Sequence, residues 1–217
     1  MTRTRLSPEV VLDACVELIG REGEHLTLCR LGEHLGVDPT AVYRHFRDKD
    51  ELMRAVGDRI LSAVTVELPG QGSDWRAVVV EICVRLRAVH MEHPTIAALA
   101  RRGPPLNRNE FDLTEQVLTA LAGAGLEPPE AALAYHALIE LTVGSAALDA
   151  AVSAVEQNQR AREYRRWQDT YRALDPAEHP RAVAHANHLY SGTADERFRY
   201  ALDRLLDGIV AGSAQRE

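Results

Sequence analysis

The chain has 217 residues, of which 46% are hydrophobic and 5% aromatic, and its formal net charge is −7 at pH 7. This length allows one large domain or two small ones with a sizeable core. The acidic balance argues against a protein that binds nucleic acid non-specifically through overall positive charge. Ala and Leu together outnumber the β-branched residues, which predicts an all-α fold.

The sequence contains no apolar run of about 18 residues, the length that marks a membrane-spanning helix. Its N-terminus, MTRTRLSPE, lacks the apolar core of a signal peptide. We therefore expect a cytoplasmic protein without a membrane partner. The cysteines have the spacing of neither a disulfide framework nor a metal site, so reduced packing residues are expected (Cys15, Cys29, Cys83).

The first predicted helix begins after residues 1–6, which look like a mobile arm. Ser7 and Pro8 are typical of a helix start, and apolar residues follow at helical spacing (Val11, Ala14, Cys15, Leu18). Two glycines loosen its end (Gly20, Gly23). We expect this helix to be the scaffold on which the next two helices pack.

Residues 27–52, TLCRLGEHLGVDPTAVYRHFRDKDEL, predict two short helices joined by a tight turn. Thr27 is a helix N-cap residue, and leucines follow at the spacing of a buried face (Leu28, Leu31, Leu35). Gly36 allows a sharp stop, and Asp38 with Pro39 restarts a helix at once. About three residues join the helices, which is the geometry of a helix-turn-helix.

The second of these helices is expected to bury Val42 and Phe46 and to expose its other side chains (Thr40, Tyr43, Arg44, Arg47). Such a helix lays its N-terminal half in the major groove of DNA. Asp48 caps the following helix, and Glu51 completes a capping box. Apolar residues at helical spacing then extend that helix to about Glu67 (Leu52, Val56, Ile60, Ala63, Val64).

The segment GVDPTAVYRHFRDKDEL resembles the recognition helix and following turn of the tetracycline-repressor (TetR) family of bacterial transcription regulators. The specific part is an aromatic-x-x-phenylalanine pattern followed by a charged turn with lysine (Tyr43, His45, Phe46, Lys49). The resemblance is strong over residues 7–56 and looser over most of the remainder. It implies a DNA-binding head, a helical ligand-binding body and a homodimer on a palindromic double-stranded operator.

The DNA-binding candidates all lie in the head (Thr27, Pro39, Thr40, Tyr43, Arg44, His45, Lys49). Arg44 is expected to read a base, most often guanine, and Thr40 to contact a base or sugar. Four others are expected to hold phosphates (Thr27, Tyr43, His45, Lys49). Residues 1–67 carry 9 Lys/Arg and 12 Asp/Glu, a net charge of −3, so binding must depend on a local basic patch (Arg3, Arg5, Arg44, Arg47, Lys49).

The segment from Pro69 to Ser73, PGQGS, interrupts the helical pattern and predicts the domain boundary. We expect a helix-turn-helix head at residues 1–67 and a ligand-binding and dimerisation body at 68–217. Helices are predicted over 74–92, 95–101, 110–122, 128–156, 160–174 and from a capping box at Thr193 and Glu196 to about residue 211, with a loop over 175–193.

The helix at 128–156 is apolar nearly all round, so it is expected to be buried on every side. Small residues within it would allow another helix to approach closely (Gly144, Ser145, Ala146, Ala147). Residues 130–152 and the last helix are the predicted dimer interface, which the resemblance also implies. The apolar stripe of the last helix could instead be covered inside one subunit.

The ligand-binding candidates in the body are His136, Glu140, His90 and Trp167. Buried titratable groups need partners, so His136 and Glu140 are expected either to line a pocket for a polar or cationic ligand or to form an internal pair. His90 is close enough to His93 for a shared metal, although half-exposed residues are more typical there. Trp167 belongs to an aromatic stripe that favours core or lid packing over ligand stacking (Tyr164, Trp167, Tyr171).

Tetracycline-binding members of the TetR family use a His, a Thr and an acidic residue around a drug-bound magnesium ion. The matching positions hold Arg101, Pro104 and Asp149, so no metal and no cofactor is expected. The sequence also lacks a nucleophile elbow and a glycine-rich phosphate loop. The resemblance therefore implies a ligand-responsive transcription regulator, most simply a repressor. The alternatives are a helical interaction protein without DNA-binding activity and an enzyme.

Overall fold

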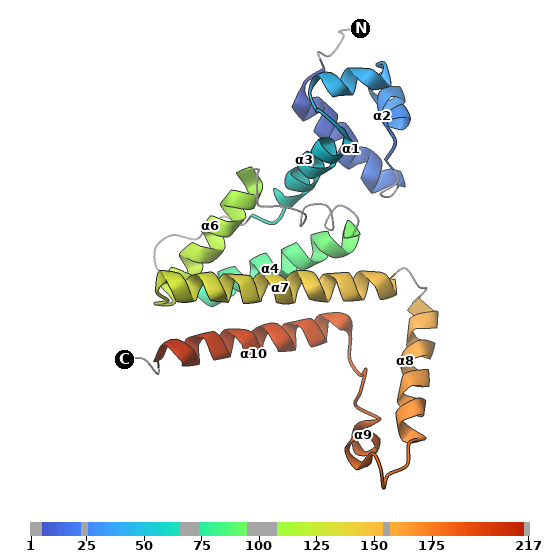
Figure 1. The fold of residues 1–217 in the computed structure, drawn as a ribbon, viewed down its shortest axis with the longest axis vertical. Coiled ribbons are helices and arrows are strands. Elements are labelled where there is room, and N and C mark those ends of the chain that lie inside the picture. Colours follow the sequence, from blue (N-terminus) through green and yellow to red (C-terminus); the bar gives the residue numbers. More distant parts are fainter. Residues whose placement is uncertain (1–5, 23–25, 66–73, 95–107, 154–156, 215–217) are drawn as a thin grey trace.

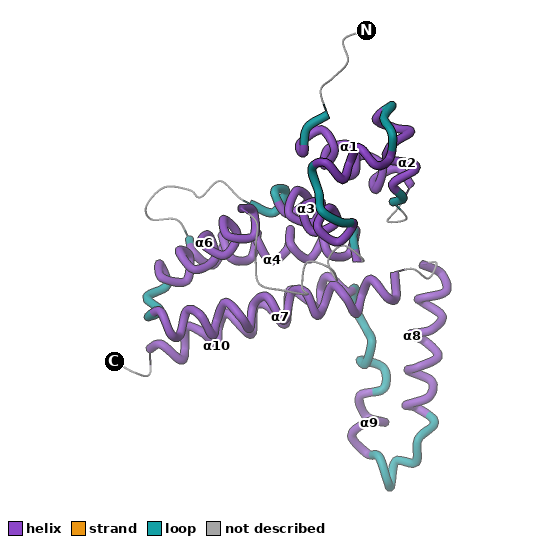
Figure 2. The backbone as a smooth tube through the Cα atoms, turned by 45° about the horizontal axis from the view of Figure 1, so that its top comes forward, coloured by secondary structure: helices purple, strands orange, loops and turns teal. Residues whose placement is uncertain are grey.

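The structure is a computed structural model that describes residues 6–22, 26–65, 74–94, 108–153 and 157–214. This described part is helical and consists of helices joined by turns and loops (Figure 1 and Figure 2). In chain order the elements are α1 (Pro8–Glu22), α2 (Leu28–Leu35), η1 (Pro39–Arg44), α3 (Lys49–Leu61), α4 (Trp75–Glu92), α6 (Arg108–Gly123), α7 (Pro128–Ser153), α8 (Gln157–Arg172), α9 (Pro180–His185) and α10 (Ala194–Ala214).

The head is a small bundle of α1, α2, η1 and α3 around one apolar core (Val11, Cys15, Leu31, Val42, Phe46, Leu52, Val56). Thr27 caps α2, because its hydroxyl accepts a hydrogen bond from the Arg30 N–H at 3.3 Å. Gly36 ends α2 in the left-handed conformation, with φ at 65°. The predicted all-α class and the helical hairpin of residues 27–46 are therefore confirmed.

The helix that leaves the head is shorter than predicted. α3 ends at Leu61, and a turn follows from Ser62 to Val64. The Ser62 hydroxyl donates to the Arg59 carbonyl at 2.7 Å, and this local bond competes with a further helical turn. Leu61 and Val64 enter the body core, whereas Ala63 is exposed. Residues 66–73, which include Glu67 and the predicted domain boundary, lie outside the described residues.

The body core lies between α4, α6, α7 and α10, with α4, α7 and α10 running side by side in both views (Figure 1 and Figure 2). Its fully buried side chains are aliphatic (Val79, Ile82, Leu121, Leu138, Leu202, Leu206). The predicted helices at 74–92 and 110–122 are confirmed, as is the last helix with its capping box at Thr193 and Glu196. The short helix predicted over residues 95–101 lies outside the described residues.

One buried charge ties three body helices together. Arg87 on α4 is only 5% exposed, and its guanidinium donates to Asp149 on α7 at 2.6 Å and to Asp195 on α10 at 2.5 Å. It also donates to the Ser145 hydroxyl at 3.2 Å and lies 5.0 Å from the centre of the Phe198 ring. A buried guanidinium needs this number of partners, so the network fixes α4, α7 and α10 relative to one another.

Helices α8 and α9 extend away from the body as a separate arm (Figure 1 and Figure 2). The prediction of a loop over residues 175–193 is wrong in part, because α9 occupies 180–185. Pro180 stands at its first position, where the missing N–H costs nothing. Trp167 of α8 packs edge-on against Tyr190, with ring centres 4.7 Å apart, and Tyr164 stacks on the same ring. The aromatic stripe therefore packs within the arm.

The prediction that α7 is buried on every side is wrong for a single chain. Leu133 and Leu148 are each 73% exposed, while Leu138 and Ala146 are fully buried against the rest of the body. By length and composition α7 is apolar enough to cross a membrane, over residues 128–150. Here it packs along α4, α6 and α10 as a body helix, and one of its faces stays uncovered.

Candidate nucleic-acid interface and effector body

The two helices of the helix-turn-helix cross at Gly32 on α2. A Cβ atom at Gly32 would lie 2.9 Å from the Pro39 ring and 2.9 Å from the Val37 carbonyl oxygen. The second contact is with backbone, which cannot rotate out of the way. The hairpin angle that presents η1 therefore requires glycine at this position.

We expect Gly32→Ala to lower the free energy of unfolding by about 1–3 kcal/mol, because the added methyl group forces α2 and η1 apart. DNA affinity should fall with it, since the exposed side chains of η1 change direction. Thermal unfolding and a DNA-binding titration measure the two effects. Gly123→Ala on α6 is the matched control, because a Cβ atom there would lie 3.9 Å from its nearest neighbour, the Cβ of Trp75, which is an ordinary contact. Equal behaviour of both variants would contradict the crossing geometry.

The second helix of the motif is a 3-10 helix, η1, and not the α-helix that the spacing of Val42 and Phe46 suggested. It starts at Pro39 and ends at Arg44. It is short because only nine residues separate its N-cap, Asp38, from the N-cap of α3, Asp48. Short segments of this kind are where 3-10 geometry is found. Val42 and Phe46 are nonetheless buried in the head core, as predicted.

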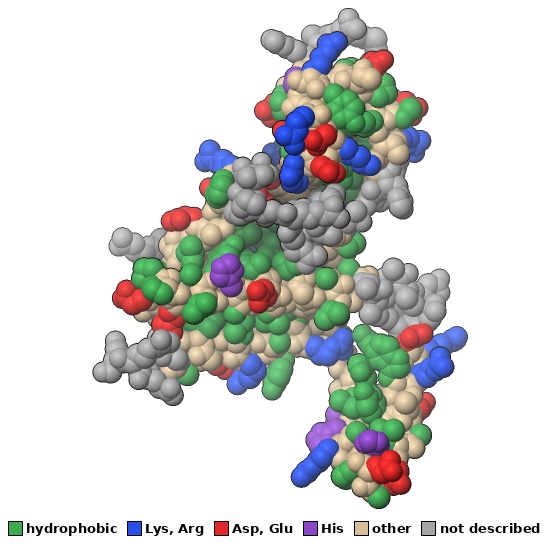
Figure 3. Space-filling view, viewed as in Figure 1, with side chains coloured by type: hydrophobic (Ala, Val, Ile, Leu, Met, Phe, Trp, Pro, Cys, Tyr) green, Lys and Arg blue, Asp and Glu red, His purple; other side chains and the backbone are tan. Residues whose placement is uncertain are grey.

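The predicted DNA-binding side chains lie on the outside of the head. Six of them are exposed (Thr27, Thr40, Tyr43, Arg44, His45, Lys49), and Pro39 is half-buried against α2. Figure 3 shows several basic side chains on this end of the molecule. Within the described part of the chain, neither Arg44 nor Lys49 forms an ion pair. Both cations are therefore available to an external anion.

Two acidic caps hold η1 and α3 in place. The Asp38 carboxylate accepts the Thr40 backbone N–H at 2.8 Å and the Thr40 hydroxyl at 2.6 Å, and these bonds lower the pKa of Asp38. The Glu51 N–H and the Arg47 guanidinium similarly lower the pKa of Asp48. A lowered pKa in the folded state means that both caps stabilise the head at neutral pH and are lost as the pH falls through those lowered values.

The body candidates His136 and Glu140 are exposed on α7, so the expectation that they are buried is wrong. Ala134 and Leu138 of that helix are buried, whereas His136 and Glu140 fall on the same exposed face as Leu133. His136 packs edge-on against Tyr135, with ring centres 5.6 Å apart. No ion pair forms between His136 and Glu140, both of which the structure describes. The alternative expectation, an internal His–Glu pair within the core, is therefore not supported either.

The other two ligand candidates lie on different helices. His90 is half-buried near the end of α4, and its Nδ1 lies 2.9 Å from the Leu86 carbonyl oxygen. Trp167 is 38% exposed and belongs to the arm. In the described part of the chain no group of three or more His, Cys, Asp or Glu side chains has the geometry of a metal site. The four candidates therefore do not converge on one site within a single chain.

The profile of bacterial regulatory proteins of the tetR family matches residues 11–56. A second profile, of the tetracyclin repressor-like C-terminal domain, matches residues 68–212. The chain belongs to the TetR family. It is a transcription regulator with a helix-turn-helix head, and not an enzyme.

An HTH-type transcriptional regulator of Saccharopolyspora erythraea is 30% identical to this TetR-family chain over 145 residues, which are 66% of this chain but only 61% of that relative. An HTH-type transcriptional repressor of Mycobacterium tuberculosis is 29% identical over 214 residues, covering 94% of this chain and 80% of the relative. The structure of the Streptomyces coelicolor TetR family protein ActR in complex with actinorhodin has a TM-score of 0.85 at 25% identity, covering 96% of this chain and 97% of ActR.

Asp149 has a structural role in this TetR-family chain. It is the one residue that matched the acidic position of the tetracycline-binding members, and it accepts a hydrogen bond from the buried Arg87. Arg101 and Pro104 lie outside the described residues. An arginine within the apolar run VVVEICVRLRAVH was the sequence signal that could have found the Arg87 network, because a charge in such a run needs a buried partner.

The head contacts the body through α3, at a helix cap that the sequence did not indicate. Asp58 on α3 accepts the Asn109 side-chain amide at 2.9 Å and the Glu110 backbone N–H at 3.2 Å. Its own carbonyl accepts the same amide at 3.0 Å. Asp58 thus caps the N-terminus of α6 from another domain. No sequence pattern signals a cap that is supplied from more than 50 positions away.

Proposed function

We propose that this TetR-family regulator is a homodimeric repressor that binds a palindromic operator and is released by a small-molecule inducer. Its head would be residues 1–67 and its ligand-binding and dimerisation body residues 68–217, and it would act in the cytoplasm. The observation that carries the proposal is the exposed face of η1. There Thr40, Tyr43, Arg44 and His45 are exposed, while Val42 and Phe46 are buried in the head core.

The uncovered face of α7 supports dimerisation. Leu133, Gly144 and Leu148 fall on one face of the helix, and the two leucines are each 73% exposed. Nothing lies within 4 Å of a Cβ atom built on Gly144, so a second helix has room to approach. Tyr200 on α10 is 69% exposed. Figure 3 shows hydrophobic side chains along α7 and α10, a pattern that fits an interface between two copies.

A two-fold dimer would present one copy of η1 to each half of an operator. Symmetric helix-turn-helix dimers contact half-sites about one helical turn of DNA apart, roughly 34 Å. The negative net charge of the chain makes non-specific binding weak, so specificity would rest on the exposed side chains of η1. Arg44 would read a base edge, and Lys49, at the start of α3, would hold a phosphate.

The body would hold the inducer. ActR, whose fold is similar over nearly the whole chain, is described in complex with actinorhodin. We propose His136, Glu140 and His90 as polar contacts and Trp167 as an apolar one. Because the four lie apart within one chain, such a site would take residues from both copies of the dimer. The exposure of His136 and Glu140 in one chain means that such a site would be open to solvent on the α7 side or closed by a second copy.

The Asp58 cap is the proposed link between inducer and DNA. It joins α3, which leads to the DNA-binding surface, to α6, which packs on α7. A ligand changes DNA affinity only through its preference for one arrangement of the heads. A coupling of about 1–3 kcal/mol would lower operator affinity some 5- to 150-fold. Because the α3–α6 contact is direct, a shift of α6 would move the head.

We expect Asp58→Ala to lower the free energy of unfolding by about 1–2 kcal/mol, because two donors at the start of α6 lose their acceptor. Amide exchange at the N-terminus of α6 should accelerate, and hydrogen-exchange mass spectrometry measures it. Asp112→Ala is the control, since Asp112 pairs with Arg108 inside α6 and is not bonded to α3 in the structure. Unchanged exchange in Asp58→Ala would show that this cap does not join head and body.

A footprint of the purified protein on the DNA upstream of its own gene tests the proposed function. Protection of a symmetric site supports it. A folded, dimeric protein that protects no DNA there and binds none elsewhere would favour the alternative of a helical interaction protein.

A further inference from the structure

The hydroxyl group of Thr40 already donates its proton within the head. Its oxygen lies 2.6 Å from a carboxylate oxygen of Asp38, and the Thr40 backbone N–H donates to the same oxygen at 2.8 Å. These bonds, the hydroxyl bond foremost, lower the pKa of Asp38, so the carboxylate is ionised at neutral pH. An ionised carboxylate only accepts hydrogen bonds, so the shared proton belongs to Thr40. The exposed hydroxyl therefore offers an outside partner its lone pairs.

The backbone beside Thr40 offers no free donor either. Pro39 has no N–H group. The Ala41 N–H donates to the Asp38 carbonyl oxygen at 2.9 Å, and the Thr40 N–H is bonded to the Asp38 side chain. The first three residues of η1 thus present hydrogen-bond acceptors and no free N–H group.

Most groups on DNA cannot bond to such a surface. The oxygens of phosphate and deoxyribose are acceptors, as are N7 and O6 of guanine and O4 of thymine in the major groove. The Asp38 carboxylate also repels phosphates. The base donors in the major groove are the N6 amino group of adenine and the N4 amino group of cytosine. These amino groups are the complement of the Thr40 oxygen.

We infer that Thr40 determines specificity by accepting a hydrogen bond from an exocyclic amino group of a base, N6 of adenine or N4 of cytosine. The inference rests on the proposed docking of η1 in the major groove, and it narrows the Thr40 contact within that docking. Arg44, at the other end of η1, presents only donors. A half-site then combines an amino group at one position with an acceptor, such as guanine, at another.

Selection of DNA from a random pool by three full-length proteins locates the base pair: wild type, Thr40→Val and Thr40→Ser. Valine has the shape of threonine without the oxygen, and the backbone N–H of residue 40 still bonds to Asp38. One symmetric pair of positions should lose its enrichment with valine and keep it with serine. The affinity of Thr40→Val for the wild-type site should fall roughly fivefold for each half-site.

Two negative results of this selection have different meanings. A wild-type protein that selects a palindrome, together with a Thr40→Val protein that selects the same one with equal affinity, would overturn the inference alone. A wild-type protein that enriches no sequence would overturn the proposed function, and the inference with it.

Base analogues at the located pair identify the group that Thr40 contacts. Purine in place of adenine, or 2-pyrimidinone in place of cytosine, removes the amino group. This removal should cost the wild type roughly fivefold more affinity for each half-site than it costs Thr40→Val. A 7-deazapurine in the same pair removes an acceptor and should cost both proteins equally. Comparing the two proteins cancels the effect of each analogue on the duplex. Equal costs of amino-group removal would overturn the inference.

Asp38→Asn separates the polarity of Thr40 from the charge beside it. The asparagine carbonyl still accepts both bonds from Thr40, and asparagine is as good an N-cap as aspartate. The base preference should therefore persist, while affinity for all sequences should rise several-fold at low ionic strength because the phosphates no longer meet a carboxylate.

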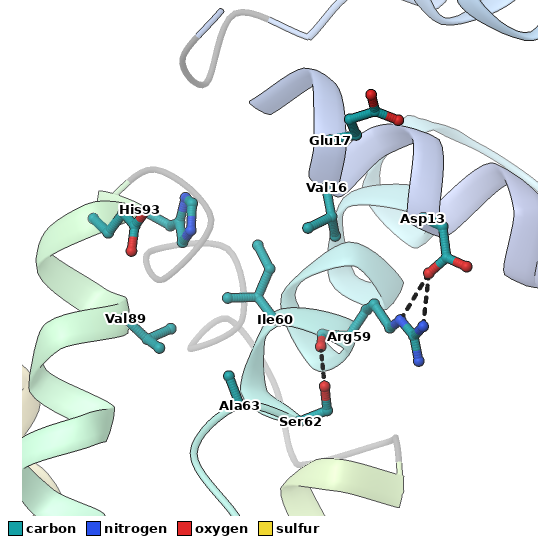
Figure 4. Close-up of a pocket in the computed structure, with 10 residues that line it drawn as sticks. Asp13, Val16, Glu17, Arg59, Ile60, Ser62, Ala63, Val89 and His93 are labelled. Atoms are coloured by element: carbon teal, nitrogen blue, oxygen red, sulfur yellow. Dashed lines mark hydrogen bonds and ion pairs between the residues drawn. The ribbon is translucent and has the colours of Figure 1, made fainter. Parts of the chain in front are cut away.

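Asp13→Asn is the matched control for the charge. It removes the same charge from a residue that bonds to Arg59, near the end of α3 that adjoins the body (Figure 4). Circular dichroism establishes that the variants are folded. A rise in affinity no larger in Asp38→Asn than in Asp13→Asn, or a base preference that Asp38→Asn abolishes, would overturn the inference.

Discussion

Replacing Leu148 by Glu is expected to convert the proposed dimer into folded monomers. Leu148 is 73% exposed in one chain, so a glutamate there costs the isolated subunit little. In the proposed interface the same carboxylate would be buried against apolar surface without a partner, at a cost of several kcal/mol. Operator affinity should fall by at least about 100-fold, because one head contacts only half a site. Sedimentation and a DNA-binding titration measure the two effects.

Leu133→Glu should behave like Leu148→Glu, because both residues end the same exposed stripe of α7. Phe111→Glu is the matched control: Phe111 is 53% exposed on α6, outside the proposed interface. Leu205 on the last helix is a poorer target, since it packs against the body core of its own chain. A Leu148→Glu protein that remains dimeric, or a wild-type protein that is monomeric at micromolar concentration, would contradict the proposed interface.

Arg44→Ala is expected to relax the choice of base at one position in each half-site. Arg44 is exposed at the end of η1 and has no ion-pair partner among the described residues. A bidentate contact between arginine and guanine contributes about 1–3 kcal/mol of discrimination per half-site. Binding to the best site should weaken accordingly, while binding to sites altered at that position should change little. Titration of a panel of single-base variants measures the pattern.

Lys49→Ala provides the comparison. Lys49 is the exposed first residue of α3, and a phosphate contact there would carry no base information. Its removal should weaken all sequences alike and reduce the salt slope by about one per contact. If Arg44→Ala changed neither affinity nor base preference, η1 would not enter the major groove in the proposed orientation.

The head could be predicted from local sequence because local interactions define it. Thr27, Asp38 and Asp48 cap the helices that their positions indicated, and each uses its own side chain for the cap. Gly36 adopts the left-handed conformation that the turn requires. Capping and turn signals of this kind act over a few residues, so the local structure that they specify does not depend on contacts with distant parts of the chain.

Features that depend on distant partners were missed. The length of α3 was overestimated because apolar spacing continues through Val64, although Val64 belongs to the body core and the helix has already ended. The 3-10 form of η1 follows from the short distance in sequence between its own N-cap, Asp38, and the N-cap of α3, Asp48. The spacing of apolar residues does not indicate this. Arg87 and Asp58 find their partners on other helices, and no periodicity encodes those contacts.

The candidate ligand site shows the same limit. His136 and Glu140 were expected to be buried because the sequence around them is apolar on every face. In the structure the apolar residues of α7 form two faces. One face packs on the body, and the other is left uncovered. An apolar helix therefore indicated either complete burial or a second copy, and sequence alone could not separate the two.

Selection of DNA from a random pool by the full-length protein tests the central claim most directly. Sequencing of the selected fragments should give a palindrome whose half-sites are about one helical turn apart. The same selection with Arg44→Ala should lose information at one symmetric pair of positions. A pool without enriched sequence, or a single asymmetric site bound equally well by Arg44→Ala, would contradict the account of this protein as a dimeric operator-binding regulator.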